Sequence, residues 1–197
     1  KGAKGFAQGD TYQNVENVVG SGFADKLTGD DKDNSFIGGK GADTIDGGAG
    51  FDTVDYTNAL ADVAPKLDSK GQPIVDQTGI EVFLDGTASK GGEAQGDILT
   101  GIERVIATDK NDTLHGGAGS ESFDARAGDD LLIGSAGADT LDGGAGIDTV
   151  DYSDSTAAVK VYLDGTAGSG GQAEGDVLRG VEMVIGSAFA DTLIGSA

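Results

Sequence analysis

Residues 38–55 read GGKGADTIDGGAGFDTVD, which is one nine-residue unit written twice in succession. The unit returns twice at residues 134–151, as GSAGADTLDGGAGIDTVD. The shared pattern is G-G-x-G-x-D-x-U-x, in which U is a large aliphatic residue. Because four near-perfect copies keep one nine-residue frame, the pattern predicts a repeat architecture.

Less regular copies lengthen each tandem pair into a block. Four units run over residues 20–55 and five over 107–151, and a unit at 186–194 opens a third block. The U positions are all apolar: Leu27, Phe36, Ile45, Val54, Leu114, Phe123, Leu132, Leu141, Val150 and Leu193. The same frame runs backwards to three valines, which are Val18, Val105 and Val184.

A longer repeat joins the blocks, because residues 8–27, 95–114 and 174–193 align without gaps. This predicts a first block, a connecting segment, a second block, a second connecting segment and the start of a third block, at residues 1–55, 56–106, 107–151, 152–185 and 186–197. The first connecting segment carries an insertion at 57–81. We interpret the insertion as a surface loop or small hairpin, or as plain linker.

The composition excludes several classes of protein. Acidic residues outnumber basic ones 34 to 13, which gives a net charge of −21 and argues against nucleic acid or an anionic membrane surface as partner. No apolar run is long enough for membrane insertion. Without cysteine there are no disulfides or thiolate zinc sites. The single histidine and the lack of a G-x-S-x-G motif argue against an enzyme.

Each unit divides into a six-residue turn and a three-residue strand. The glycines suit a turn with positive φ, and the U residue is the one inward-facing side chain of its strand. Two units make one coil, and stacked coils enclose a core one side chain deep between two parallel sheets. We therefore expect an all-β fold of the β-roll type. Such a core buries too little apolar area to outweigh chain entropy unaided.

The turns have the chemistry of calcium sites. Calcium takes six to eight oxygen ligands, and a glycine-rich turn offers backbone carbonyls beside the aspartate at its sixth position. Turns 18 residues apart lie on the same edge of the roll, so an ion between them draws on both. The pairs 20–25 with 38–43, 29–34 with 47–52, 107–112 with 125–130, 116–121 with 134–139, and 125–130 with 143–148 predict about five ions.

The predicted metal ligands are turn glycines and the polar residues of the frame. They are Gly20, Asp25, Asp30, Asn34, Gly38, Gly39, Gly41, Asp43, Gly47, Gly48, Gly50, Asp52, Asp109, Asp112, Gly116, Gly119, Glu121, Gly128, Asp130, Gly134, Gly137, Asp139, Gly143, Gly144, Gly146, Asp148 and Asp191. Turn preference alone explains an aspartate near glycine, but not its return at one position of the frame. Arg126 replaces a glycine and is unfavourable beside a cation.

Six further acids recur outside the nine-residue frame, and either complete terminal calcium sites or cap strands. They are Asp10, Asp97 and Asp176, with Glu16, Glu103 and Glu182.

The GGxGxDxUx copies and the VFLDGTA and VYLDGTA segments (82–88 and 161–167) resemble the repeats-in-toxin (RTX) family of calcium-binding proteins. The resemblance covers nearly the whole chain outside the insertion. It implies a right-handed parallel β-roll, or solenoid, with calcium between stacked glycine-rich turns. It also implies a larger parent protein, exported unfolded by type I secretion machinery and folded by extracellular calcium, in the medium or on the bacterial cell surface.

Two functions are compatible with this resemblance. The first is a calcium-dependent structural and folding module of the parent protein. The alternative is calcium-dependent adhesion, with binding to cell-surface or extracellular polysaccharide. Tyr56, Tyr152 and Tyr162 suit sugar stacking, but they equally suit packing of the connecting segments onto the roll.

Overall fold

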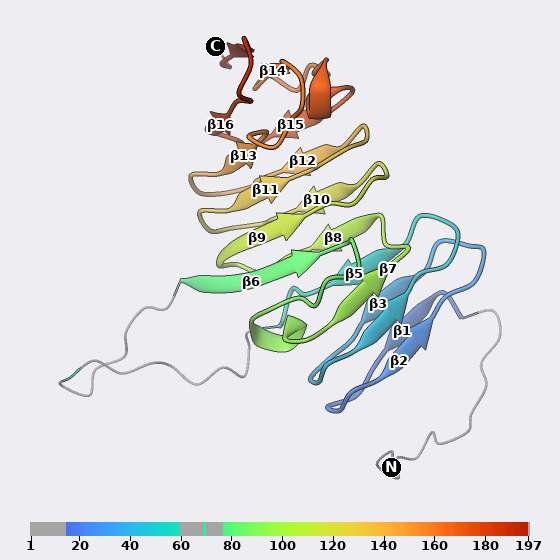
Figure 1. The fold of residues 1–197 in the computed structure, drawn as a ribbon. Helices are drawn as coiled ribbons and strands as arrows, with labels where there is room; N and C mark the ends of the chain where they lie inside the picture. Colours follow the sequence, from blue (N-terminus) through green and yellow to red (C-terminus); the bar gives the residue numbers. More distant parts are fainter. Residues whose placement is uncertain (1–14, 60–68, 70–76, 197) are drawn as a thin grey trace.

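The computed structural model describes residues 15–59, 69 and 77–196, and this part of the chain forms a stack of short parallel strands without an α-helix (Figure 1). The strands are β1 (Asn17–Val19), β2 (Lys26–Thr28), β3 (Ser35–Ile37), β4 (Thr44–Asp46), β5 (Thr53–Asp55), β6 (Thr78–Phe83), β7 (Ile98–Thr100), β8 (Arg104–Ile106), β9 (Asn111–His115), β10 (Ser122–Asp124), β11 (Leu131–Ile133), β12 (Thr140–Asp142), β13 (Thr149–Asp151), β14 (Lys160–Tyr162), β15 (Val177–Arg179), β16 (Met183–Ile185) and β17 (Thr192–Ile194). Two single-turn 3₁₀ helices, η1 (Gly92–Ala94) and η2 (Gly171–Ala173), lie in the connecting segments. Neither described helix has the length or apolarity needed to cross a bilayer.

The register confirms that two nine-residue units make one coil. Within the blocks each strand pairs in parallel with the strand 18 residues further on, as Leu27 does with Ile45 and Leu114 with Leu132. The strands carry β-branched and aromatic residues, while the glycine-rich stretches between them turn the chain back. The expected all-β parallel roll is thus confirmed.

The core is one side chain deep, as the frame predicts. The middle residue of most three-residue strands is buried between two more exposed neighbours. Nine U-frame side chains are at most 1% exposed: Phe36, Ile45, Val54, Val105, Leu114, Phe123, Leu132, Leu141 and Val150. Val18, Leu27 and Val184 are partly buried near the ends, and Leu193 is 48% exposed in the last coil.

The connecting segments change the sheet arrangement of the roll. In the first, β6 opens a new sheet (β6-β9-β11-β13-β16), β7 ends the sheet β2-β4-β7, and β8 continues the seven-stranded sheet β1-β3-β5-β8-β10-β12-β15. In the second, β14 opens a sheet with β17, and β15 ends the seven-stranded sheet. A connecting coil therefore has three strands where a block coil has two. The first and second blocks therefore share the continuous seven-stranded sheet.

The predicted insertion at 57–81 lies mostly outside the described residues. Its last four residues, 78–81, already belong to β6, which pairs in parallel with β9, so here the structure has a strand of the roll where the sequence suggested a surface loop, a small hairpin or a linker. Gly79 and Ile80 are both buried, and the side chain of Ile80 is only 2% exposed and joins the core. This burial explains why the chain forms a strand of the roll here.

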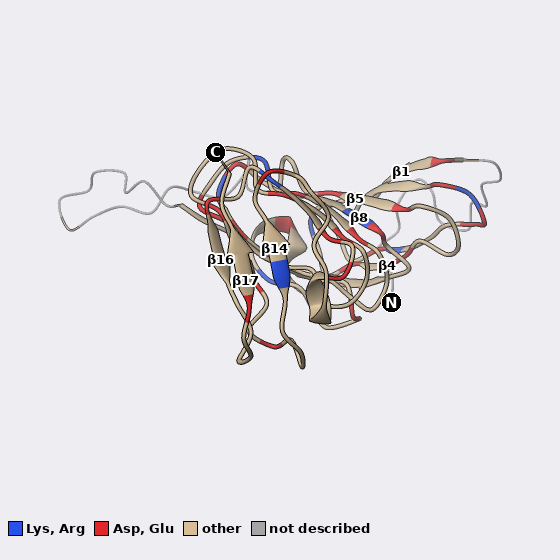
Figure 2. Cartoon of the chain, turned by 90° about the horizontal axis from the view of Figure 1, so that it is seen from above, with Lys and Arg blue, Asp and Glu red and all other residues tan. Residues whose placement is uncertain are grey.

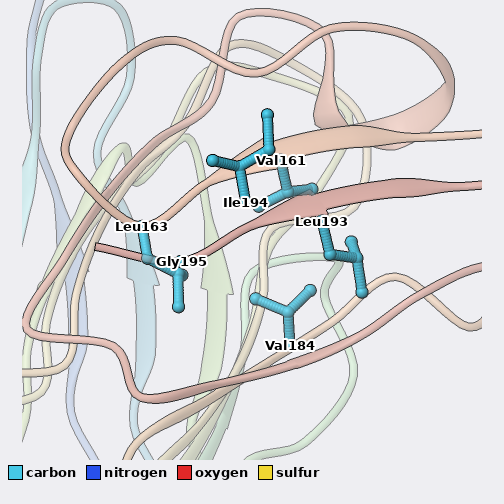
Figure 3. Close-up of a pocket in the computed structure, with 6 residues that line it drawn as sticks. All are labelled: Val161, Leu163, Val184, Leu193, Ile194 and Gly195. Atoms are coloured by element: carbon cyan, nitrogen blue, oxygen red, sulfur yellow. The ribbon is translucent and has the colours of Figure 1, made fainter. Parts of the chain in front are cut away.

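An apolar pocket lies at the C-terminal end of the roll. It is lined by Val161, Leu163, Val184, Leu193, Ile194 and Gly195 (Figure 3). None of these residues carries a titratable group or a side-chain metal ligand. The pocket is therefore a feature of the core at the last described coil, and the chemistry of the molecule lies in the turns.

Candidate metal centre

The position-six side chains of stacked turns form a hydrogen-bonded ladder. The backbone N–H of Asp25 donates to Oδ1 of Asp43 at 2.8 Å, and the N–H of Asp43 donates to Oδ1 of Asp97 at 2.8 Å. Each rung joins one coil to the next, so one oxygen of every such carboxylate is occupied. The same bond links Asn34 to Asp52, Asp112 to Asp130, Glu121 to Asp139, and Asp130 to Asp148.

Six of the position-six carboxylates have a second oxygen that is buried and has no hydrogen-bond partner. This holds for Oδ2 of Asp43, Asp52, Asp130, Asp139 and Asp148 and for Oε2 of Glu121. All six residues are at most 7% exposed. A buried charge without a partner is strongly destabilising, because it has lost its hydration without gaining a hydrogen bond or an opposite charge. Each of these oxygens therefore needs a proton or a cation.

Glycine leaves room beside these oxygens. A Cβ added at Gly38 would lie 2.5 Å from Oδ2 of Asp43, and one at Gly116 would lie 3.0 Å from Oε2 of Glu121 and also against the carbonyl oxygen of Gly134 in the next coil. Backbone carbonyls and carboxylates are the oxygen ligands that a hard cation such as calcium prefers. In the described residues no group of three or more acidic, histidine or cysteine side chains is placed so that it could hold a metal ion by itself, so most ligands here would be carbonyls.

The electrostatics point the same way, and acidic segments far outnumber basic ones over the described roll (Figure 2). Burial, together with the charges of Asp112 and Asp148, raises the pKa of Asp130 to about 7. Burial likewise raises the pKa of Asp139 and of Glu121, and the charge of Glu121 adds to the shift of Asp139. A divalent cation between the turns would relieve both the burial and the repulsion.

Comparison with known families agrees with this geometry. A family model described as the RTX calcium-binding nonapeptide repeat (4 copies) matches residues 19–54, 97–130 and 115–150. Both blocks thus match the RTX calcium-binding nonapeptide repeat. No curated protein gives a significant match to the chain. The match falls on both blocks, which hold all six unpaired carboxylate oxygens.

The predicted RTX glycines fall into two groups. Those at the first turn position lie beside the carboxylate of their own turn, as Gly20, Gly38, Gly47, Gly116, Gly134 and Gly143 do. Those at the second and fourth positions have φ between 89° and 150°, where a side chain would be strained: Gly39, Gly41, Gly48, Gly50, Gly128, Gly137, Gly144 and Gly146. Gly119 also stands at the fourth position but has no positive φ, and it donates its N–H to Oε1 of Glu121 at 3.2 Å.

In the first turn of each block, a serine or threonine of the same turn donates hydrogen bonds to the aspartate. Oδ2 of Asp25 accepts the N–H of Ser21 at 2.6 Å, and the hydroxyl of Ser187 donates to Oδ1 of Asp191 at 2.6 Å. Asp112 accepts both the N–H and the hydroxyl of Thr108, at 2.8 and 2.9 Å. In all three turns a serine or threonine stands at turn position two, four residues before the aspartate. Ser135 holds the same position before Asp139, but its hydroxyl donates to the carbonyl of Gly116 and leaves Oδ2 of Asp139 unpaired.

The turns of each block stack in two rows, and in the connecting segment one row ends on an aspartate that accepts a hydrogen bond from a tyrosine. The hydroxyl of Tyr56 donates to Oδ2 of Asp97 at 2.8 Å, and that of Tyr152 donates to Oδ2 of Asp176 at 2.7 Å. Both aspartates are fully buried, and both tyrosines are at most 3% exposed. These tyrosines pack the connecting segments onto the roll and are not accessible to a sugar. The sequence analysis did not pair them, although the tyrosine recurs in both DTVDY segments, 52–56 and 148–152, and the aspartate recurs in the two later copies of the long repeat.

Three residues of the RTX turns lie at the exposed edge. Asp30 is exposed and accepts the N–H of Lys32 at 3.0 Å. Asp109 is also exposed and accepts Nε of Arg126 at 2.9 Å. The side chains of Asp30 and Asp109 thus lie outside the buried ladder. Arg126 has a φ of 72°, replaces a glycine at the cost of strain, and carries an ion pair at the surface.

Proposed function

We propose that this chain is a calcium-binding structural module of a larger type I-secreted bacterial protein, and that it folds on meeting extracellular calcium. The observation that carries the proposal is the set of six buried carboxylate oxygens without partners. The residues that would hold calcium are the position-six carboxylates and the carbonyls of the neighbouring glycine-rich turns. We expect no catalytic role for this segment.

The physical basis is that the calcium-free roll lacks enough stabilising free energy. Its core is one side chain deep, and its net charge of −21 opposes compaction. Metal binding energy is then folding energy. Each ion adds about 2.7 kcal/mol of folding free energy when free calcium is 100 times Kd. Extracellular calcium modules bind with Kd of about 10⁻⁴–10⁻³ M, which suits a chain that stays unfolded until export.

Far-UV circular dichroism with a calcium titration tests this function. In chelator we expect a largely unfolded chain, and near millimolar calcium a cooperative gain of β-structure. Magnesium at equal concentration is the control and should be a poor substitute, because it demands octahedral geometry and dehydrates reluctantly. Equal β-structure in chelator and in calcium would contradict the proposal.

A further inference from the structure

Each block has two rows of stacked turns, and the two rows end differently at the connecting segment. One row ends on Asp97 or Asp176, each closed by a tyrosine hydroxyl. The other row ends on a glutamate. Oε2 of Glu103 accepts the N–H of Asp52 at 2.8 Å, and Oε2 of Glu182 accepts the N–H of Asp148 at 2.9 Å.

The glutamate ends keep the features of a cation site. Oδ2 of Asp52 and of Asp148 is buried and unpaired, and both residues are 0% exposed. A Cβ at Gly47 would lie 2.6 Å from Oδ2 of Asp52 and against the carbonyl oxygen of Gly101 in the connecting segment. The second junction repeats this arrangement, with Gly143 beside Oδ2 of Asp148, at 2.6 Å, and beside the carbonyl oxygen of Gly180. A carboxylate oxygen and a carbonyl oxygen therefore face the same small space.

The glycines that supply these carbonyls have a conformation suited to the task. Gly101 has a φ of 58° and Gly180 a φ of 53°, which is the left-handed region that other residues rarely adopt. This backbone lets a turn shorter than the six-residue turns of the blocks stack onto turn 47–52 or 143–148. The N–H of Gly47 donates to the carbonyl of Thr100 at 2.9 Å, and that of Gly143 to the carbonyl of Arg179 at 3.0 Å, which fixes this stacking.

The aspartate ends lack those features. The three atoms nearest to a Cβ at Gly38 all belong to Asp43, and those nearest to a Cβ at Gly134 all belong to Asp139, so no carbonyl of the connecting segment lies as close. Both oxygens of the terminal aspartate are also occupied, one by a backbone N–H and one by the tyrosine hydroxyl. A cation has no free carboxylate oxygen of Asp97 or Asp176 to bind.

We propose that Glu103 and Glu182 complete two junction calcium sites, the first with Asp52 and the carbonyl of Gly101, the second with Asp148 and the carbonyl of Gly180. These sites are additional to the turn pairs within the blocks, whereas the tyrosine-closed rows end without an ion. The inference rests on the proposed calcium binding. Its consequence is that an ion at each junction joins a block to its connecting segment, and so couples the order of one to the other.

The double variant Glu103→Gln/Glu182→Gln tests the junction sites. Glutamine keeps an acceptor for the N–H groups of Asp52 and Asp148 but removes the charge that calcium needs. Native mass spectrometry of the whole chain near the calcium midpoint should show two ions fewer than in wild type. Each single variant, measured in parallel in case the double variant does not fold, should lose one. The matched control Glu93→Gln/Glu174→Gln, in the same connecting segments, should lose none.

The rows that end on a tyrosine-bonded aspartate provide a second test of the junction sites. Asp97→Asn/Asp176→Asn should leave the ion count unchanged, because neither aspartate binds calcium. A wild-type chain that binds no calcium would defeat the proposed function itself. A wild-type chain that binds calcium, with the glutamine variants matching their control in ion count, would overturn only the junction sites.

Discussion

Asp139→Asn is expected to reduce calcium-dependent stability strongly while leaving the calcium-free chain no less stable than wild type. Asparagine keeps the side-chain oxygen that accepts the N–H of Glu121 at 2.9 Å, so the ladder survives. The charge at the buried Oδ2 position is lost. Complete loss of one ion costs about 2.7 kcal/mol at 100 times Kd. In chelator the same change removes repulsion with Glu121, so the substitution should stabilise the calcium-free chain or leave its stability unchanged.

The measurement is the calcium midpoint of folding, together with urea unfolding in saturating calcium and the residual far-UV circular dichroism signal in chelator. Asp154→Asn is the matched control, since it makes the same charge change at an exposed position of the second connecting segment. Its midpoint should stay close to that of wild type. Equal shifts in both variants would show that Asp139 acts only through net charge.

Acidification is expected to favour the folded state in the absence of calcium. Burial raises the pKa of Asp130 to about 7 and that of Asp97 and Asp176 to about 6, from an ordinary value of 3.8. Burial also raises the pKa of Asp43, Asp52 and Asp148. A raised folded-state pKa contributes stability that is fully present below the ordinary value and is lost as pH rises through the folded value. The calcium-free chain should therefore gain stability as pH falls from about 7.

Protons and calcium compete for the Oδ2 atoms of Asp43, Asp52, Asp130 and Asp148, so the stability added by calcium should shrink over the same pH range. Each proton taken up on folding changes the folding equilibrium about tenfold per pH unit. Circular dichroism between pH 7.5 and pH 5, with chelator and with calcium, measures both effects above the isoelectric point of about 4.1. Repeating the series at high salt separates the buried groups from screened surface charge. A calcium-free signal that does not change with pH would contradict the assignment.

The blocks could be predicted from the sequence because one rule governs them. Every ninth residue must be apolar to fill the core, and the turn glycines must adopt positive φ, so both constraints are written into the nine-residue frame. Phe123 and Leu132 are buried where that frame places them, and Asp139 and Asp148 lie in the ladder. Stacking at 18 residues follows from two units per coil.

The connecting segments could not be predicted in the same way, because their coils follow no nine-residue period. The third strand of each coil, β6 or β14, lies outside the frame. Its buried residue Val82 or Val161 pairs with Leu114 or Leu193, 32 residues further on, and this spacing is not a multiple of nine. The closure of Asp97 by Tyr56 joins residues 41 apart in the chain. Only the three-dimensional path of the coil brings such pairs together.

The buried Oδ2 atoms can be tested directly in crystals of the chain grown with calcium, by anomalous scattering. Anomalous peaks are expected at about 2.3–2.6 Å from Oδ2 of Asp43, Asp52, Asp130, Asp139 and Asp148, with neighbouring turn carbonyls completing each shell. A folded roll with these oxygens bound only to water, or with calcium confined to exposed carboxylates such as Asp30 and Asp109, would contradict the claim that cations between stacked turns hold the roll together.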